Sequence, residues 1–342
     1  MGRVYWVRRI LEDRYEHLTL SRLLARNPGM QLAVGVFAIT VAFLTAVACL
    51  PPANAADSPS GRPAAKFEAK GPEKKDGIET YVITSDYQEK PCEVQVLLPG
   101  NFTREGRYKV LYVMPVNAGM GGRWGSAIGE AKKLDLANKY GIICVEPTFS
   151  RWPWYGDHPT DTKIRYGSYL PEVIVPFMDK TFPTLAKPEG RALVGFSKSG
   201  TGAIGLLLRD PDIFGRAGSW DAPLMMTTVG DFETTEIYGT QENFTKYSIP
   251  ELLTKNATLL QGQPARIAIM GHSMFRPHTE RGHKLADDLR IPHYFDNSVN
   301  RPHNWGSGWL APLVEVLMAE DMAKARPALT PPTEEAGRRS DR

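Results

Sequence analysis

Residues 191–205 read Arg-Ala-Leu-Val-Gly-Phe-Ser-Lys-Ser-Gly-Thr-Gly-Ala-Ile-Gly. A short apolar strand leads into the Gly-Phe-Ser-Lys-Ser-Gly turn, and a helix of small residues is expected over 201–209. A serine at the apex of a sharp strand-to-helix turn is the arrangement of a nucleophile elbow. Small residues at Gly195 and Ser199 allow the strand and the helix to approach closely. Ser197 is therefore the candidate nucleophile.

The same turn predicts where a developing oxyanion would be bound. The backbone N–H of Lys198 lies at the start of the helix, where the helix dipole favours negative charge. A second donor is expected from the small-residue loop that follows the strand at 110–116. Val116 and Asn117 are the candidates for that donor.

Strand and helix patterns alternate from residue 78 onward. Strands are predicted over 78–84, 92–98, 110–116, 142–146, 192–194, 216–220, 266–270 and 292–296. Helices are predicted over 128–140, 169–181, 201–209, 279–289 and 311–324. This alternation indicates an α/β fold with a mainly parallel sheet covered by helices on both faces. Such sheets carry their active sites at the carboxyl ends of the strands.

Composition divides the 342 residues into one domain with polar extensions. Residues 56–76 are rich in Pro, Ala, Gly, Lys and Ser and are predicted to be a disordered linker, and residues 326–342 a disordered tail. The globular domain is expected over 77–325. Positions 1–55 hold six of the 41 basic residues and three of the 38 acidic ones, which leaves 35 of each for the remainder. That balance gives no indication of a nucleic-acid partner.

The first 55 residues have the pattern of an export signal. Arginines precede an uncharged apolar run at 31–50, and Ala53-Asn54-Ala55 provides a small-x-small cleavage pattern before Ala56. The run is also long enough to be an uncleaved membrane anchor. Residues 46–49, Ala-Val-Ala-Cys, loosely resemble a lipoprotein box. The expected location is periplasmic or secreted, with any membrane contact made only by this segment.

Three cysteines are too few for a disulfide framework or a zinc cluster. Cys49 lies in the leader, whereas Cys92 and Cys144 fall in predicted strands. Buried free thiols are the simplest interpretation of these two, and a disulfide is the alternative because export implies an oxidising compartment.

A serine nucleophile needs a base to accept its proton and a carboxylate to orient that base. His303 lies in a loop between the last predicted strand and the closing helix, where a base is expected. Asp221 ends the strand after the elbow helix, so it should lie beside Ser197 and is the predicted acid. Glu280 is the alternative acid, although it should already be inside a helix.

The other histidines give no recognisable metal site. His272, His278 and His283 surround one loop, but no acidic or cysteine partner completes a ligand set, so neither a metal nor a cofactor is predicted. His158 and His293 are interpreted as surface or structural residues.

Aromatic residues follow the strand at 142–146. Trp152, Trp154 and Tyr155 could form the wall of a substrate pocket, and ordinary surface packing is the alternative.

These motifs resemble the putative esterase family of α/β hydrolases, which includes S-formylglutathione hydrolases, feruloyl and acetylxylan esterases, siderophore esterases and mycolyltransferases. The resemblance covers about residues 78–323. It rests on Tyr108-Lys-Val-Leu-Tyr-Val-Met-Pro, Gly195-Phe-Ser-Lys-Ser-Gly, Phe214-Gly-Arg-Ala-Gly-Ser and Pro302-His-Asn-Trp. It implies a single α/β-hydrolase domain with Ser197 as nucleophile and His303 as base. Two positions differ from the family: the loop at 271–279 lacks the usual acid, and Pro115-Val116 replaces a common His-Gly.

Three functions are compatible with these residues. The first is an exported serine carboxylesterase that acts through an acyl-enzyme on a small-molecule or polysaccharide-linked ester. An acyltransferase would use the same site with a different second nucleophile. A non-catalytic binding protein that retains the fold is the third, and the altered acid loop is its main support.

Overall fold

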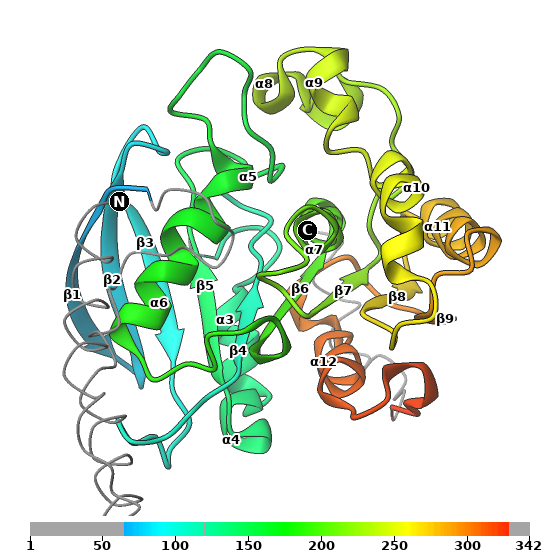
Figure 1. Ribbon diagram of the computed structural model, residues 1–342. Coiled ribbons are helices and arrows are strands. Elements are labelled where there is room, and N and C mark those ends of the chain that lie inside the picture. Colours follow the sequence, from blue (N-terminus) through cyan, green and yellow to red (C-terminus); the bar gives the residue numbers. More distant parts are fainter. Residues whose placement is uncertain (1–64, 120, 328–342) are drawn as a thin grey trace, which may run out of the picture. The chain divides into compact units, whose positions relative to one another are not determined.

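The computed structural model describes residues 65–119 and 121–327, which form a nine-stranded sheet covered by helices (Figure 1). The strand order is β1-β2-β3-β5-β4-β6-β7-β8-β9. β1, β2 and β3 pair antiparallel and β3 joins β5 antiparallel, whereas all pairs from β5 to β9 are parallel. The strands are β1 (Phe67–Lys75), β2 (Ile78–Ser85), β3 (Cys92–Leu97), β4 (Val110–Val113), β5 (Ile143–Pro147), β6 (Arg191–Phe196), β7 (Arg216–Trp220), β8 (Ile267–His272) and β9 (His293–Asn300). The predicted mainly parallel α/β fold is confirmed.

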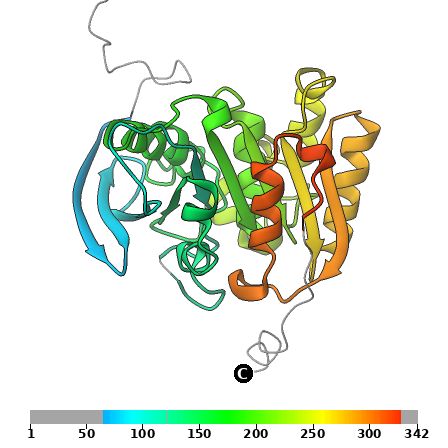
Figure 2. The same ribbon diagram turned by 90° about the horizontal axis from the view of Figure 1, so that it is seen from below.

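The helices lie on both faces of this sheet, as the view from below shows (Figure 2). The α-helices are α3 (Ala127–Lys133), α4 (Leu136–Tyr140), α5 (Tyr166–Tyr169), α6 (Val175–Thr181), α7 (Ser197–Arg209), α8 (Thr235–Tyr238), α9 (Gln241–Thr245), α10 (Ile249–Leu260), α11 (Arg276–Asp288) and α12 (Leu310–Met318). Residues of α3, α4 and α12 belong to one hydrophobic core, and residues of α6, α7 and α10 belong to another.

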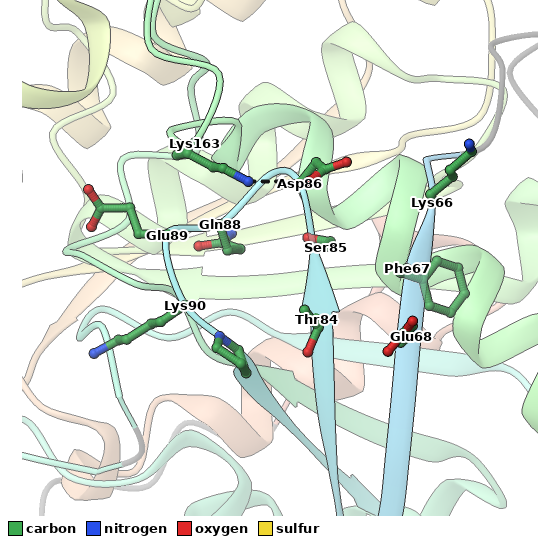
Figure 3. A pocket seen from close by; sticks show the side chains of 11 residues that line it. Lys66, Phe67, Glu68, Thr84, Ser85, Asp86, Gln88, Glu89, Lys90 and Lys163 are labelled. Carbon is green, nitrogen blue, oxygen red and sulfur yellow. Dashed lines mark hydrogen bonds and ion pairs between the residues drawn. The ribbon is translucent and has the colours of Figure 1, made fainter.

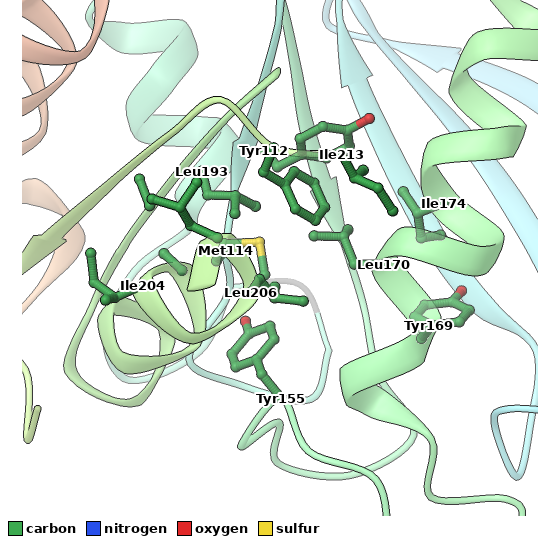
Figure 4. Close-up of a cluster of buried hydrophobic side chains, with 14 of the residues drawn as sticks. Tyr112, Met114, Tyr155, Tyr169, Leu170, Ile174, Leu193, Ile204, Leu206 and Ile213 are labelled. Carbon is green, nitrogen blue, oxygen red and sulfur yellow. The ribbon is translucent and has the colours of Figure 1, made fainter. Parts of the chain in front are cut away.

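Side-chain alternation along the central strands builds these two cores. In β4, Val110 and Tyr112 contribute to one core while Leu111 and Val113 contribute to the other. The first core fills the space between β4, β6 and α7 with large apolar side chains (Figure 4). A strand that is buried on both faces needs apolar residues throughout, which is why the central strands have no polar alternation.

One predicted boundary is wrong. Residues 67–75 belong to β1, not to a disordered linker, so the described domain begins before residue 77. β1 is an edge strand whose residues after Phe67 are all exposed, so its polar composition gave no strand signal. Its pairing with β2 shifts between Lys70 and Glu73, where Pro72 has no N–H to donate.

Several helices differ from the sequence prediction. The helix predicted over 128–140 breaks into α3 and α4 at Asp135, which has left-handed backbone angles. The helix predicted over 169–181 begins earlier, at α5, and passes through a π-helical segment at Leu170–Ile174 before α6. Helices α8, α9 and α10 fill the connection between β7 and β8, for which no element was predicted.

The predicted leader at 1–55 and nearly all of the tail lie outside the described residues. Among the described residues, none of the helices has the length and apolar character needed to cross a membrane. Cys92 and Cys144 are buried free thiols, as the simpler interpretation expected.

A buried carboxyl group on β5 gives a prediction about stability. Glu146 is 1 % exposed, and its Oε2 accepts a 2.7 Å hydrogen bond from the Ile128 N–H at the start of α3. Burial raises its pKa from 4.5 to about 7, although the backbone donors oppose the shift. The folded state then binds more protons than the unfolded state between these values, so this group destabilises the fold as pH rises from 4.5 to about 7.

Glu146→Gln should therefore increase the free energy of unfolding at pH 8 by about 1–3 kcal/mol, because it removes the buried charge and keeps an acceptor oxygen for Ile128. The gain should shrink toward pH 4.5. Urea unfolding at several pH values measures it, and Glu251→Gln, at an exposed position of α10, is the control. An equal effect at both ends of the pH range would contradict the interpretation.

Candidate active site

The β6–α7 turn has the strained geometry of a nucleophile elbow. Ser197 has φ 53°, a left-handed conformation that is uncommon for a non-glycine residue. Its N–H donates a 3.2 Å hydrogen bond to the carbonyl of Asp221. A Cβ on Gly195 would lie 2.5 Å from the backbone of Ser199, so only glycine permits the close approach of strand and helix. The hydroxyl of Ser199 bonds back to Phe196 through both its N–H and its carbonyl, which closes the turn.

Asp221 lies next to the elbow because of the strand register. Phe196 and Trp220 are paired residues of the parallel strands β6 and β7, so the next residue on each strand, Ser197 and Asp221, also lies beside its counterpart. The Asp221 side chain is fully buried, and its Oδ2 lies 2.6 Å from Nδ1 of His303. This is the contact that the predicted role of Asp221 as the acid requires.

The loop at 271–279, which has no carboxylate of its own, donates two backbone hydrogen bonds to the Asp221 carboxylate. The Met274 N–H donates to Oδ2 at 3.1 Å and the Phe275 N–H donates to Oδ1 at 2.7 Å. Burial opposes ionisation of Asp221, but the hydrogen bonds from His303 and this loop outweigh burial and lower its pKa. The carboxylate is therefore held ionised, and both of its oxygens are bonded.

Gly271 lets this loop turn beneath the carboxylate. It has φ +63°, and a Cβ there would lie 1.5 Å from the Trp220 ring. The β8–β9 pairing shifts register between Met270 and His272, at the same point. The bend directs the following N–H groups toward Asp221.

Three aromatic rings surround the imidazole of His303. The rings of Phe196, Trp124 and Phe275 have centroids 4.9, 5.3 and 5.8 Å from it. The His303 side chain is only 9 % exposed. Since Nδ1 is bonded to the buried carboxylate, Nε2 is the nitrogen available to exchange a proton at the elbow.

Glu280, the alternative acid, is directed elsewhere. It lies on α11, where Arg276 binds its Oε1 at 2.7 Å and the Asn297 amide donates to the same oxygen at 3.1 Å. These contacts hold the Glu280 carboxylate at the protein surface. Asp221 is the carboxylate that contacts His303 in the described structure.

The predicted oxyanion donors belong to two segments that follow neighbouring strands of the sheet. Lys198 is in the first turn of α7, where backbone N–H groups have no partner within the helix. Val116 and Asn117 follow β4, which is paired with β6 in the sheet. The Asn117 amide donates a 2.6 Å hydrogen bond to the Gly121 carbonyl and so fixes this loop. Among the described residues, the N–H groups of Val116 and Asn117 donate no hydrogen bond.

The Lys198 side chain lies against two of the predicted pocket aromatics. Its Nζ is 3.9 Å from the centroid of the Trp152 ring and 5.2 Å from that of Trp154. Burial lowers the pKa of Lys198 to about 8, although the charge of Glu233 opposes the shift. Trp152 is 55 % exposed, so this face is open to solvent.

Tyr155 is a core residue and does not belong to a pocket wall, which corrects that prediction. It is 2 % exposed, its hydroxyl donates a 2.5 Å hydrogen bond to the Pro115 carbonyl, and its ring fills the space beside Gly202 of α7 (Figure 4). Trp154 is also buried, at 5 % exposure, in the same hydrophobic core, so Trp152 is the exposed residue of the three predicted pocket aromatics.

His272 and His278, which the sequence places around one loop, have different hydrogen-bond partners. His272 Nδ1 contacts the Asn297 side chain at 2.8 Å, and His278 Nδ1 accepts the Met225 N–H at 3.1 Å. His158 Nδ1 accepts the Asp161 N–H at 2.9 Å. These three are structural residues in the described fold.

A pocket of about 440 Å³ opens at the other end of the sheet, between β1, β2 and the following loop (Figure 3). Positively and negatively charged side chains line it, among them Lys66, Asp86 and Lys163. Because β1 and β2 are separated from β6 by three strands, this pocket is distant from the elbow.

A strained serine elbow, a buried Asp–His pair and an N–H-lined loop at the carboxyl ends of parallel strands define the class of α/β serine hydrolases. The sequence pattern of the family described as "Putative esterase" matches residues 85–232. This match includes Ser197 and Asp221 and covers less than half of the chain, which has the α/β-hydrolase fold.

Solved structures share the fold at low sequence identity. A ferulic acid esterase is 16 % identical with a TM-score of 0.56, and the match covers 74 % of this chain and 97 % of that one. A fluorophosphonate-binding serine hydrolase of Staphylococcus aureus is 16 % identical with a TM-score of 0.55, over 75 % and 100 % of the chains. An S-formylglutathione hydrolase of Agrobacterium tumefaciens is 13 % identical with a TM-score of 0.53, over 69 % and 92 %. No curated protein matches the chain by sequence.

Proposed function

We propose that the chain hydrolyses carboxylic esters through an acyl-enzyme formed on Ser197. The observation that carries the proposal is the 2.6 Å contact between His303 Nδ1 and the buried Asp221 carboxylate, beside the elbow. A binding protein that merely retained the fold would have no need of a buried ionised carboxylate held by three donors, because burying a charge is unfavourable unless it is paired.

Each residue has one role in the proposed cycle. His303 Nε2 accepts the proton of the Ser197 hydroxyl as the oxygen attacks the ester carbonyl, and Asp221 stabilises the imidazolium. The Lys198 N–H, together with an N–H of Val116 or Asn117, stabilises the oxyanion. The imidazolium then returns the proton to the departing alcohol. Water, activated by the same imidazole, releases the acid and restores Ser197.

The test is covalent labelling with a fluorophosphonate probe. The probe should modify the chain once, and peptide mass spectrometry should place the adduct on Ser197. Ser197→Ala should abolish the adduct, whereas Ser199→Ala should retain it because Ser199 bonds to the turn backbone. A folded protein that is not labelled would exclude the esterase mechanism in favour of a binding function. An alcohol acceptor that suppresses release of free acid would identify the acyltransferase alternative.

The ammonium of Lys198, the residue after Ser197, predicts a preference among esters. An ester that carries a carboxylate should have a KM about 3–10-fold lower than its neutral analogue at pH 7, because a partly buried cation attracts the anion. The preference should vanish above about pH 8, where Lys198 loses its proton. Lys198→Gln should remove it at all pH values and leave the neutral ester unaffected. Arg151→Gln, at a nearby position already paired with Glu89 and Glu236, is the control.

Export is the second part of the proposal, and it rests on residues 31–50 and Ala53-Asn54-Ala55. The mature protein should begin at Ala56 when the full chain is expressed in a bacterial host. Mass spectrometry of the periplasmic and medium fractions measures this. A lipid on Cys49 would select the lipoprotein alternative, and recovery of the intact chain from the cytosol would exclude export.

A further inference from the structure

The fold brings together two histidines and an aspartate from helix α11 and strand β9. His283 and Asp287 are four residues apart on α11, so they lie on one face of that helix. His293 begins β9, which lies beside α11 at one end of the sheet (Figures 1 and 2). His283 Nδ1 is 2.8 Å from His293 Nε2, and the Asp287 oxygens lie 3.4 Å from His283 Nε2 and 3.9 Å from His293 Nε2.

Hydrogen bonding fixes the tautomer of His293. Its Nδ1 is 2.8 Å from the Ile291 carbonyl, which can only accept, so Nδ1 carries the proton. Nε2 of His293 then accepts a hydrogen bond from His283 Nδ1, 2.8 Å away, and a metal ion would replace the shared proton. A ring N–H that donates to a backbone carbonyl is the arrangement that orients metal-ligating histidines.

His283 is held in place by packing. Its ring stacks on Phe295 with a centroid separation of 3.8 Å and an interplanar angle of 7°. Phe295 is two residues after His293 on β9, so both rings project from the same face of the strand. The side chain of His293 is 4 % exposed and that of Asp287 is 60 % exposed, so the cluster has an ordered interior and an open side.

We propose that His283, Asp287 and His293 bind one divalent transition-metal ion such as Zn²⁺. Two imidazole nitrogens and one carboxylate oxygen are a common donor set for zinc, and ligand atoms 2.0–2.1 Å from a tetrahedral ion lie about 3.3 Å apart. The three donor atoms lie within 4.8 Å of one another, so their separations need to close by at most about 1.5 Å to reach that geometry. Water would complete the coordination on the open side.

The site is structural and separate from ester hydrolysis. His293 pairs with Ile267, the first residue of β8, so it lies at the end of the strands opposite to the catalytic edge. The metal would tie the edge strand β9 to α11 and should stabilise the fold by mass action. This expectation does not depend on the proposed esterase mechanism.

The experiment is a titration of the full, untagged and metal-free chain with Zn²⁺ and with Co²⁺. Calorimetry should show one Zn²⁺ per chain and a higher unfolding temperature with metal, and Co²⁺ should give the visible absorption of a tetrahedral site. His293→Ala should weaken Zn²⁺ binding at least a hundredfold, and Asp287→Asn about tenfold.

Asp288→Asn is the matched control, because the neighbouring carboxylate binds Lys284. It should leave Zn²⁺ affinity unchanged, and all three variants should retain esterase activity without metal. Absence of saturable binding up to millimolar Zn²⁺ would overturn the proposal. So would binding that His293→Ala and Asp287→Asn leave intact, since the metal would then be bound elsewhere.

Discussion

Ser197→Ala is expected to lower kcat/KM for a short p-nitrophenyl ester by at least about 10³-fold and to leave the folded structure intact. The hydroxyl is the only group of this residue that the proposed chemistry uses. Ala and Ser meet the same backbone strain at φ 53°, so the substitution should change the elbow little. Steady-state kinetics measures the loss, and the unfolding temperature shows whether the fold is retained.

Ser199→Ala gives the matching comparison. The Ser199 hydroxyl lies two residues further along but bonds to both the N–H and the carbonyl of Phe196. Its removal should lower stability by about 1 kcal/mol and activity only modestly, because the turn loses a hydrogen-bonded brace and keeps its nucleophile. A folded Ser197→Ala protein with an unchanged rate would exclude the acyl-enzyme mechanism.

The elbow, its helix and the alternating strands could be predicted from sequence because their signals are local. Apolar runs bounded by glycine and proline define the central strands, and small residues at Gly195 and Ser199 indicate close packing at the turn. The position of Asp221 also followed from local order, since one strand–helix–strand unit places it on the neighbouring strand.

Features that depend on distant contacts could not be predicted. β1 has exposed polar residues and is a strand only because β2 pairs with it. Tyr155 could not be separated from Trp152 by residue type, although one ring is buried in the core and the other is exposed. His293 joins His283 across a helix–strand contact for which the sequence had no motif.

The loop at 271–279 has one feature that could be predicted from the sequence and one that could not. Its lack of a carboxylate was visible in the sequence and raised the possibility of an inactive site. Its actual contribution is made by the N–H groups of Met274 and Phe275, and any residue other than proline has such a group. Only the backbone path, set by Gly271, shows that the loop supports a carboxylate from another strand.

Asp221→Asn is expected to lower kcat by about 10²–10⁴-fold. Asp221 accepts three hydrogen bonds: Oδ2 from Met274 and His303, and Oδ1 from Phe275. An asparagine offers one acceptor oxygen and one NH₂ donor. If the NH₂ replaces Oδ1, it faces the Phe275 N–H, and two donors meet. If it replaces Oδ2, it faces the Met274 N–H and obliges His303 Nδ1 to accept.

In that second arrangement the His303 proton moves to Nε2, which can no longer take the proton of Ser197, and the imidazolium has no carboxylate to stabilise it. Either arrangement leaves a backbone N–H of the loop without an acceptor and should lower stability by about 1–3 kcal/mol. Kinetics should therefore be measured well below the unfolding temperature of the variant. Glu280→Gln is the control, and it should change kcat less than about fivefold because Glu280 binds Arg276 on the surface. If Glu280→Gln lost as much activity as Asp221→Asn, or if Asp221→Asn kept full activity, the assignment of Asp221 as the acid would be wrong.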